Sequence, residues 1–310
     1  MNIFQSTQHF FAKYTTFPDR VFMLLVALSL GIGFGLIALN HVDFHFTTIL
    51  LFATHISTVS WTKGFLAFIF GLVFLIYGMY VRSYSPRAST FIWGLGLFFW
   101  CLLSNMVLVN SIQATPFPPI DATLVKIDEW MGLNTPALMT WTHNHPRIHH
   151  IFHICYQAIV FELVGIPLLL TVFCRRKALG VFYIAIMITL VIGSLIYYFF
   201  PTMAPSGVFH SPYFSAAQDD TSMRFHEVHE YLKVTSTNGG LIAFPSFHVI
   251  WAILLTNCCR GKKIIFYPMA CFNLIVISAT VFLGWHYLTD VIAGFILAIG
   301  GIMFAEWVYS

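Results

Sequence analysis

Two residues near the C-terminus, His286 and Asp290, have the types and the spacing of a reactive histidine held by a carboxylate. Residues four apart on a helix share one face and can touch. A carboxylate that holds one imidazole nitrogen leaves the other nitrogen available as a base or a nucleophile. An aspartate inside an apolar segment is costly and usually marks function. A structural histidine–aspartate hydrogen bond at a helix start would give the same pattern.

A second group of residues, Pro245, Ser246 and His248, stands at the start of another apolar stretch. Pro245 and Ser246 can begin a helix, with Ser246 as its N-cap. The backbone N–H groups at such a helix start can bind phosphate. His248 would lie in the first turn, where it can protonate a leaving oxygen. The alternative is a simple capped helix with an interfacial histidine.

Together the two groups form a pattern suited to phosphoryl transfer. His286 would attack phosphorus to give a phospho-histidine, with Asp290 holding its tautomer, while His248 protonates the departing alkoxide. Water or an alcohol would then take the phosphoryl group, and His248 would act as the base. A competing hypothesis of another class is a non-enzymatic transporter or haem-binding membrane protein whose histidines are ligands.

These stretches resemble motifs of a known family. Residues 244–248 (Phe-Pro-Ser-Phe-His) and 284–294 (beginning Gly-Trp-His-Tyr-Leu-Thr-Asp) are similar to the second and third motifs of the type-2 phosphatidic acid phosphatase superfamily. The family pattern is PSGH, and later a Ser-Arg pair, five residues, a His, three residues and an Asp. The resemblance implies that His248 is the general acid, His286 the nucleophile and Asp290 its orienting residue, and that Ser246 contacts phosphate.

The chain departs from that pattern at three places. Ala279 and Thr280 stand where the Ser-Arg pair is usual, and Phe247 replaces the glycine of PSGH. The first motif (Lys, six residues, Arg-Pro) is absent, and Tyr197–Pro205 stands in its place. These changes resemble the inositol phosphorylceramide synthase branch, which moves a phospho-head-group between lipids. A phosphodiester donor carries less charge than a phosphomonoester, so fewer arginines would be needed.

The expected activity is therefore that of an enzyme, a phosphotransferase acting on lipid phosphoesters. A lipid phosphate phosphatase that releases inorganic phosphate is the alternative. Arg147, Arg224 and Lys233 are the cations that we consider as replacements for the missing arginine. The full set of expected substrate contacts is Ser246, Phe247, Pro245, Thr280, Arg224, Lys233, Arg147 and Tyr156.

A histidine cluster invites a metal or haem interpretation. It comprises His143, His145, His149, His150 and His153, of which His149 and His153 are spaced as a ligand pair could be. No acidic or cysteine partner has matching spacing. We therefore expect no metal and no cofactor here, and interpret the cluster as interfacial and partly solvated, with substrate contact as an intermediate possibility.

The composition shows which elements must position these residues. Of 310 residues, 58% are hydrophobic and only 9% are charged, whereas soluble domains carry about 25% charged residues. In lipid the backbone must satisfy its own hydrogen bonds, which leaves helices or closed barrels. The apolar runs are roughly 20 residues long and lack period-two alternation, which indicates helices. We predict an all-α, polytopic membrane helical bundle.

About eight transmembrane helices are expected, and they form two units. Residues 1–88 would be an N-terminal extension of two spans and an interfacial or re-entrant helix at 42–60, and residues 89–310 a six-helix phosphatidic acid phosphatase-like catalytic domain. The predicted spans are approximately 21–39, 64–81, 90–110, 152–173, 178–200, 245–259, 264–284 and 287–308.

Lysines and arginines gather in alternate loops, which predicts the orientation. The segments 82–87, 175–177 and 260–263 carry most of these charges and should face the cytoplasm, with both termini. The histidine motifs would then lie on the periplasmic or lumenal face of a bacterial inner (plasma) membrane or a eukaryotic Golgi-type membrane. The expected partners are the bilayer and a phospholipid or other lipid phosphoester. No block of like charge indicates nucleic-acid binding, and the oligomeric state stays open.

Overall fold

The computed structural model describes residues 15–40, 61–232, 234–235, 240 and 242–310, and these residues contain helices and loops without a strand. The interfacial helix predicted at 42–60 and Lys233 lie outside the described residues. The helices are α2 (Phe17–Asn40), α3 (Trp61–Tyr80), α4 (Pro86–Ser111), α5 (Asp121–Trp130), α6 (Thr135–His143), α7 (Pro146–Val172), α8 (Arg176–Phe199), α9 (Ala216–His229), α10 (Phe247–Cys258), α11 (Lys263–Phe282) and α12 (Leu288–Val308), with two 3₁₀ turns, η1 (Val81–Ser83) and η2 (Pro205–Gly207).

The helices confirm the predicted polytopic bundle. Six of those in the described part of the chain, α2, α4, α7, α8, α11 and α12, are long and apolar enough to cross a membrane. Two shorter apolar helical stretches correspond to the remaining predicted spans. The first, Phe68–Ser83, comprises most of α3 and the turn η1, and the second is α10. Each of the eight predicted spans therefore coincides with a helix.

Helix α10 is too short to cross the membrane by itself. Its 12 residues extend about 18 Å, whereas the hydrocarbon core is about 30 Å thick. A span at this place needs residues 244–246, directly before α10, to lie at membrane depth, where irregular backbone is tolerated only if protein covers it. Pro245 and Ser246 are indeed buried. The start of α10 is thus enclosed by the bundle.

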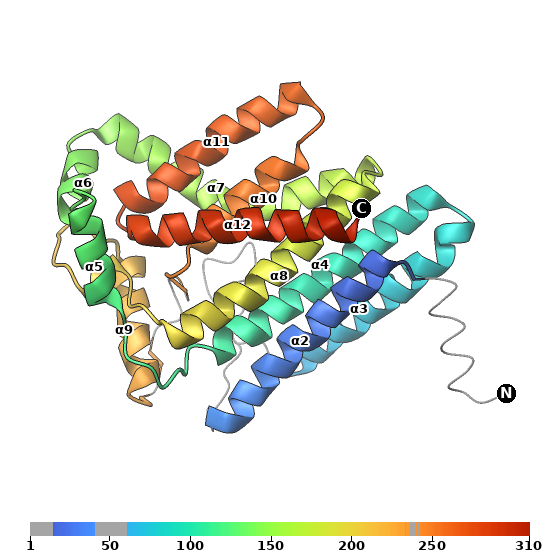
Figure 1. Ribbon diagram of the computed structural model, residues 1–310, viewed down its shortest axis with the longest axis horizontal. Coiled ribbons are helices and arrows are strands. Elements are labelled where there is room, and N and C mark those ends of the chain that lie inside the picture. Colours follow the sequence, from blue (N-terminus) through green and yellow to red (C-terminus); the bar gives the residue numbers. More distant parts are fainter. Residues whose placement is uncertain (1–14, 41–60, 233, 236–239, 241) are drawn as a thin grey trace.

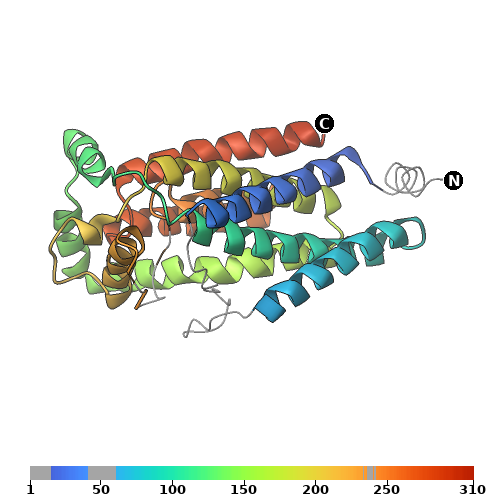
Figure 2. The same cartoon turned by 90° about the horizontal axis from the view of Figure 1, so that it is seen from below.

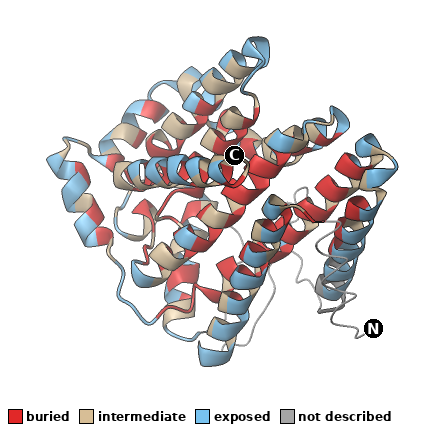
Figure 3. Cartoon of the chain, turned by 45° about the vertical axis from the view of Figure 1, so that its right-hand side comes forward, coloured by how far each residue is buried: buried red, intermediate tan, exposed pale blue. Residues whose placement is uncertain are grey.

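The long helices pack around α8 in the centre of the bundle (Figures 1 and 2). Helix α8 contacts α2, α4, α10 and α12, while α3 pairs with α4, and α7 pairs with α11. Buried residues gather in the middle, and the outward faces are more exposed (Figure 3). Large apolar residues such as Leu24, Leu274 and Met303 are exposed on those faces. Such outward apolar surface suits a lipid environment.

The two ends of the bundle differ in structure. The short helices α5, α6 and α9 gather at the end where α8 finishes and α10 and α12 begin (Figure 1). The loops at the opposite end, between α3 and α4, α7 and α8, and α10 and α11, carry the basic residues. Which membrane face each end meets remains a prediction. The predicted unit boundary at residues 88 and 89 falls in the first turn of α4 and also remains a prediction.

Candidate active site

The starts of α10 and α12 lie against each other. The backbone N–H of Ser246 donates to the carbonyl oxygen of Asp290 at 3.1 Å, which ties the two helix starts together. A Cβ on Gly294 would lie 2.6 Å from the carbonyl oxygen of Ser246, so only glycine allows this approach. The two motifs, 38 residues apart between His248 and His286 by their numbering, therefore share one place in the fold.

A tight turn between α11 and α12 presents His286. Gly284 has a φ of +74°, a conformation that favours glycine. The N–H groups of Trp285 and His286 both donate to the carbonyl oxygen of Thr280 at 3.0 Å. His286 itself is only 4% exposed. The turn thus holds the imidazole inside the protein on a backbone that is fixed by hydrogen bonds.

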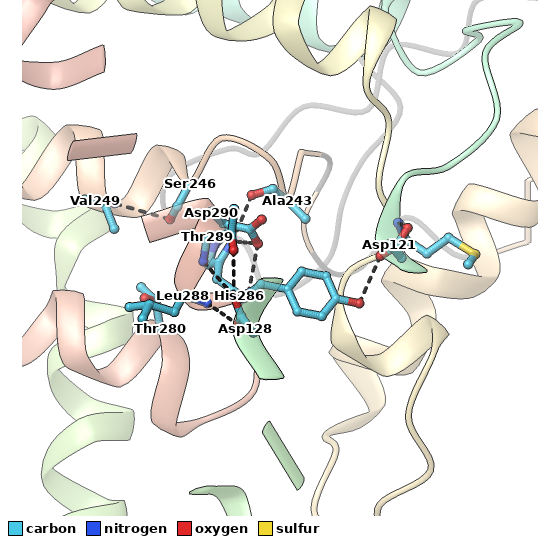
Figure 4. A network of polar contacts seen from close by, with 12 residues as sticks. Asp121, Asp128, Ala243, Ser246, Val249, Thr280, His286, Leu288, Thr289 and Asp290 are labelled. Carbon is cyan, nitrogen blue, oxygen red and sulfur yellow. Dashed lines mark hydrogen bonds and ion pairs between the residues drawn. The ribbon is translucent and has the colours of Figure 1, made fainter. Parts of the chain in front are cut away.

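The contacts of His286 determine its tautomer. Its Nδ1 lies 2.9 Å from the carbonyl oxygen of Ala243 and 3.3 Å from Oδ2 of Asp290. Both partners are acceptors, so Nδ1 must carry the proton and donate it. In the neutral ring, Nε2 then keeps its lone pair. The sequence suggested Asp290 for this role, and the structure adds the Ala243 carbonyl as the closer partner (Figure 4).

Asp290 has a second function in the local structure. Its Oδ2 accepts a hydrogen bond from the N–H of Tyr287 at 3.0 Å, as part of a capping box at the start of α12. The side chain is fully buried. Carboxylates at helix N-termini are stabilised by the N–H groups and the helix dipole. The same carboxylate therefore starts α12 and contacts the imidazole.

His248 faces His286 from the first turn of α10. The two ring centroids are 5.7 Å apart and the rings are inclined by 60°. His248 also stacks on Tyr156 of α7 (4.4 Å, 19°), which in turn stacks on Trp285 (5.2 Å, 12°). This aromatic stack restricts the plane of the His248 ring beside His286.

Helix α5 holds the start of α12 from outside through Asp128. Oδ2 of Asp128 accepts from the N–H of Leu288 at 2.7 Å, and Oδ1 accepts from the N–H and the hydroxyl of Thr289 at 3.0 and 2.6 Å (Figure 4). These bonds satisfy N–H groups that a helix start leaves without intrahelical partners. Asp128 therefore fixes the position of the helix that follows His286 directly.

Asp121, at the other end of α5, anchors Tyr287. Its Oδ1 accepts from the Tyr287 hydroxyl at 3.0 Å, and its Oδ2 accepts from the N–H of Met203 at 2.9 Å. Burial raises the pKa of Asp121 to about 6, and these hydrogen bonds offset the rise only in part. Tyr287 is the residue directly after His286, so Asp121 also positions the turn.

The comparison with protein families decides the classification. The model of the PAP2 superfamily matches residues 122–304, a span that contains His248, His286 and Asp290. The chain belongs to the PAP2 superfamily. Members of the PAP2 superfamily are generally phosphatases or phosphotransferases, so this chain is an enzyme of that general class. No curated protein and no solved structure matches it.

The other predicted PAP2 site residues on α10 and α11 have mainly structural contacts. Ser246 caps α10 weakly, with the N–H of Val249 3.5 Å from its hydroxyl. Phe247 points into the core, where its ring lies against Gly193 of α8. The Thr280 hydroxyl donates to the carbonyl oxygen of Ile277. Pro245 is buried and follows a cis peptide bond.

Among the candidate cations that the structure describes, Arg147 and Arg224, it is Arg224 that lies beside the loop before α10. It is 6% exposed on α9 and places Nη2 3.4 Å from the side-chain oxygen of Asn110. Burial lowers the pKa of Arg224 to about 10, at which the guanidinium is still charged at neutral pH. Arg224 lines a small cavity together with Ala243, whose carbonyl holds His286. Arg147 is exposed at the start of α7.

The histidine cluster lies at the same end of the bundle, on α6 and the first turns of α7. The His143 ring stacks on Tyr213 at 4.2 Å, and the His149 and His153 rings are 6.3 Å apart. Within the described part of the chain, no group of three or more His, Cys, Asp or Glu side chains is placed to hold a metal ion. Ring contacts and local hydrogen bonds, such as that between Nδ1 of His145 and the carbonyl oxygen of Trp141, organise this cluster.

Sequence reasoning did not identify Asp121, Asp128 and the Ala243 carbonyl as parts of the site. Their partners are far along the chain, with sequence separations of 166 for Asp121 and Tyr287 and 160 for Asp128 and Leu288. A signal did exist in Asp121 and Asp128, because a carboxylate near a membrane bundle is costly unless it is paired. A backbone carbonyl leaves no signal in the sequence.

Proposed function

We propose that the protein is a membrane phosphotransferase that moves a phospho-head-group between a lipid donor and an alcohol or lipid acceptor through a phospho-histidine. The observation that carries the proposal is the environment of His286. Its Nδ1 is held by two acceptors, which leaves Nε2 as the nucleophilic atom, and a second imidazole stands 5.7 Å away.

The reaction would proceed in two displacement steps. Nε2 of His286 forms a bond to phosphorus while the bond from phosphorus to the leaving oxygen breaks, and His248 gives that oxygen its proton. His248, now neutral, then takes the proton from the acceptor hydroxyl. The acceptor oxygen attacks phosphorus, the P–N bond breaks, and both histidines return to their starting states. Asp290 stabilises the positive charge on the phosphorylated imidazole.

The missing Ser-Arg pair favours a phosphodiester donor, as in the inositol phosphorylceramide synthase-like branch. The Ser-Arg pair is absent, so the site has fewer cations for a dianionic phosphomonoester. Arg224, next to Ala243, is our candidate for the remaining cation. The alternative within the same superfamily is a phosphatase that releases inorganic phosphate. We also propose that the histidine end faces the periplasm or lumen, because the opposite loops are basic.

The test is the fate of labelled phosphate. The purified protein would be incubated in bilayer nanodiscs with phospholipids labelled at phosphorus, with and without a lipid alcohol acceptor. Transfer of the label to the acceptor is expected. Release of the label only as inorganic phosphate, with acceptor present, would assign a phosphatase instead. Absence of any turnover over a panel of phospholipid head groups would contradict the phosphotransferase proposal.

Protonation of His286 gives a first prediction. Burial lowers the pKa of His286 to about 4, although the hydrogen bond to Ala243 opposes the shift. The charged form therefore appears only at low pH, and at pH 5 about 90% of the ring stays neutral, compared with about 3% for an ordinary histidine. An NMR titration of protein with ¹⁵N-labelled histidine, assigned with His286→Ala, should show this midpoint. A midpoint near 6.5 would contradict the prediction.

Removal of the Asp128 carboxylate gives a second prediction. In Asp128→Ala the start of α12 loses three hydrogen bonds, so the turn that holds His286 should shift. A displacement of about 1 Å can cost roughly 100-fold in rate. We expect kcat to fall at least about tenfold while KM stays within about twofold, since the carboxylate of Asp128 is engaged by the start of α12.

The matched control for Asp128→Ala is Glu129→Gln, because Glu129 is the exposed neighbour on α5. This variant should keep the wild-type kcat and KM. Asp128→Asn keeps one acceptor oxygen and should recover part of the rate. If Asp128→Ala raises KM with kcat unchanged, the residue acts on substrate binding and the positioning role is wrong.

A further inference from the structure

The end of the bundle opposite the histidines contains a cavity of about 460 Å³. Its walls come from the loop between α7 and α8, the first turn of α8, the end of α10 with the following loop, and the last turn of α12. The size falls within the range of small-molecule and cofactor sites. None of the residues that line this cavity is part of the candidate active site.

Positive charge dominates the lining. Arg175, Arg176, Lys177 and Arg260 contribute four cations, and among the described residues that line the cavity Glu306 supplies the one carboxylate. Arg176 is committed to the bundle interior, where its guanidinium stacks on the Trp93 ring at 4.1 Å and donates to the Ser89 hydroxyl at 3.2 Å. Arg175, Lys177 and Arg260 therefore supply the charge that a ligand would meet.

Two loops bring these cations together. Nη2 of Arg175 lies 3.8 Å from the position that a Cβ on Gly261 would take, so the α7–α8 loop lies beside the α10–α11 loop. Arg260 precedes Gly261 directly and donates to the side-chain oxygen of Asn257 at 3.2 Å. Like charges that are held near each other destabilise one another unless an anion lies between them. The arrangement thus favours an anionic occupant.

The first turn of α8 also favours an anion in this cavity. Arg175 is the N-cap residue of α8, and its side chain makes no capping hydrogen bond, while the first turn holds no acidic residue. The first N–H groups of a helix have no intrahelical partner and carry the positive end of the helix dipole. A helix start of this kind beside arginines is well suited to phosphate.

We propose that this cavity binds a phosphate-bearing anion, and that its natural source is the head group of an anionic phospholipid. Exposed apolar residues flank the lining in sequence, with Val172 and Phe173 before the α7–α8 loop and Trp307 after Glu306. Basic pockets between the ends of membrane helices hold lipid head groups in this manner. The proposal is independent of the catalytic mechanism, since the cavity lies at the other end of α8.

Ligand-dependent stabilisation tests the proposal. The detergent-purified protein would be heated with phosphatidylglycerol, phosphatidylcholine or inorganic phosphate, and the midpoint of unfolding measured, because a ligand that binds the folded state raises it. Phosphatidylglycerol should raise the midpoint and phosphatidylcholine should not. In Arg175→Gln/Arg260→Gln the half-saturating phosphatidylglycerol concentration should rise roughly fivefold for each cation removed.

Two further variants separate the cavity from general surface charge and from misfolding. Arg87→Gln removes an exposed cation at the same end of the bundle but outside the cavity lining. Phosphatidylglycerol should stabilise this variant as much as it stabilises the wild type. Glu306→Gln removes the carboxylate from the cavity lining. The half-saturating phosphatidylglycerol concentration should then fall about fivefold, a gain in affinity that misfolding cannot produce.

The outcomes decide between the possible sources of the ligand. Equal stabilisation by inorganic phosphate and phosphatidylglycerol would support the anion site but assign it to a soluble phosphate. A double variant with the wild-type response, or an Arg87→Gln variant that weakens the response as much as the double variant, would overturn the proposal. No turnover is measured, so failure of the catalytic proposal would leave these results unaffected.

Discussion

His286→Ala is expected to lower phosphoryl transfer by roughly 10⁴- to 10⁶-fold, the range seen when a covalent nucleophile is removed. The methyl group that remains cannot form a bond to phosphorus. His286 makes hydrogen bonds to Ala243 and Asp290, but α12 keeps its capping bonds from Asp290 and Asp128 in the variant. The fold should therefore survive. The rate of label transfer from a phospholipid donor measures the loss.

Chemical trapping of the intermediate sharpens this prediction. Wild-type protein quenched during turnover with ³²P-labelled donor should carry a label that is lost in acid and retained in base, as a phosphoramidate is. His286→Ala should carry none. His150→Ala is the matched control, because His150 is an exposed histidine at the same end of the molecule, and it should keep both label and rate. Substantial turnover in His286→Ala would exclude the phospho-histidine mechanism.

The parts of the structure that depend on local sequence could be predicted. Hydropathy located the eight predicted spans, though not the short helices α5, α6 and α9, because a span must be apolar over its whole length. The four-residue spacing of His286 and Asp290 predicted that they touch, and they do lie in contact, although His286 stands in the turn before α12 and not on the helix itself. Ser246 was identified as the cap of α10 from its residue type alone. In each case the interacting groups are close in sequence, so periodicity and residue type suffice.

The parts of the structure that depend on tertiary packing could not be predicted from the sequence. Asp128 caps α12 across 160 residues, and no spacing rule connects the two elements. The carbonyl of Ala243 holds His286 more closely than Asp290 does, yet any residue at that position has the same carbonyl. The sequence suggested Phe247 as a substrate contact from its motif position, whereas the ring packs against α8. Its direction depends on how α8 and α10 cross.

His248→Ala should produce a different defect from His286→Ala. Loss of a general acid and base costs roughly 10²- to 10⁴-fold, and the loss should depend on the leaving group. A lipid alkoxide needs a proton as it departs, whereas a nitrophenolate does not. With a nitrophenyl phosphodiester the variant should therefore complete the first step and stall at the second, because no base activates the acceptor hydroxyl. A burst of about one nitrophenol per protein, with trapped label on His286, is the expected signature.

The aromatic stack supplies the control for His248→Ala. Tyr156 contacts His248 through its ring, so Tyr156→Phe keeps the stack and should keep both steps near the wild-type rates. Tyr156→Ala removes the surface that orients His248 and should slow lipid donors more than the nitrophenyl donor. If His248→Ala instead slows both donors equally and gives no burst, His248 transfers no proton to the leaving group. Its place opposite His286 would then serve phosphate binding, and another group would have to protonate the departing oxygen.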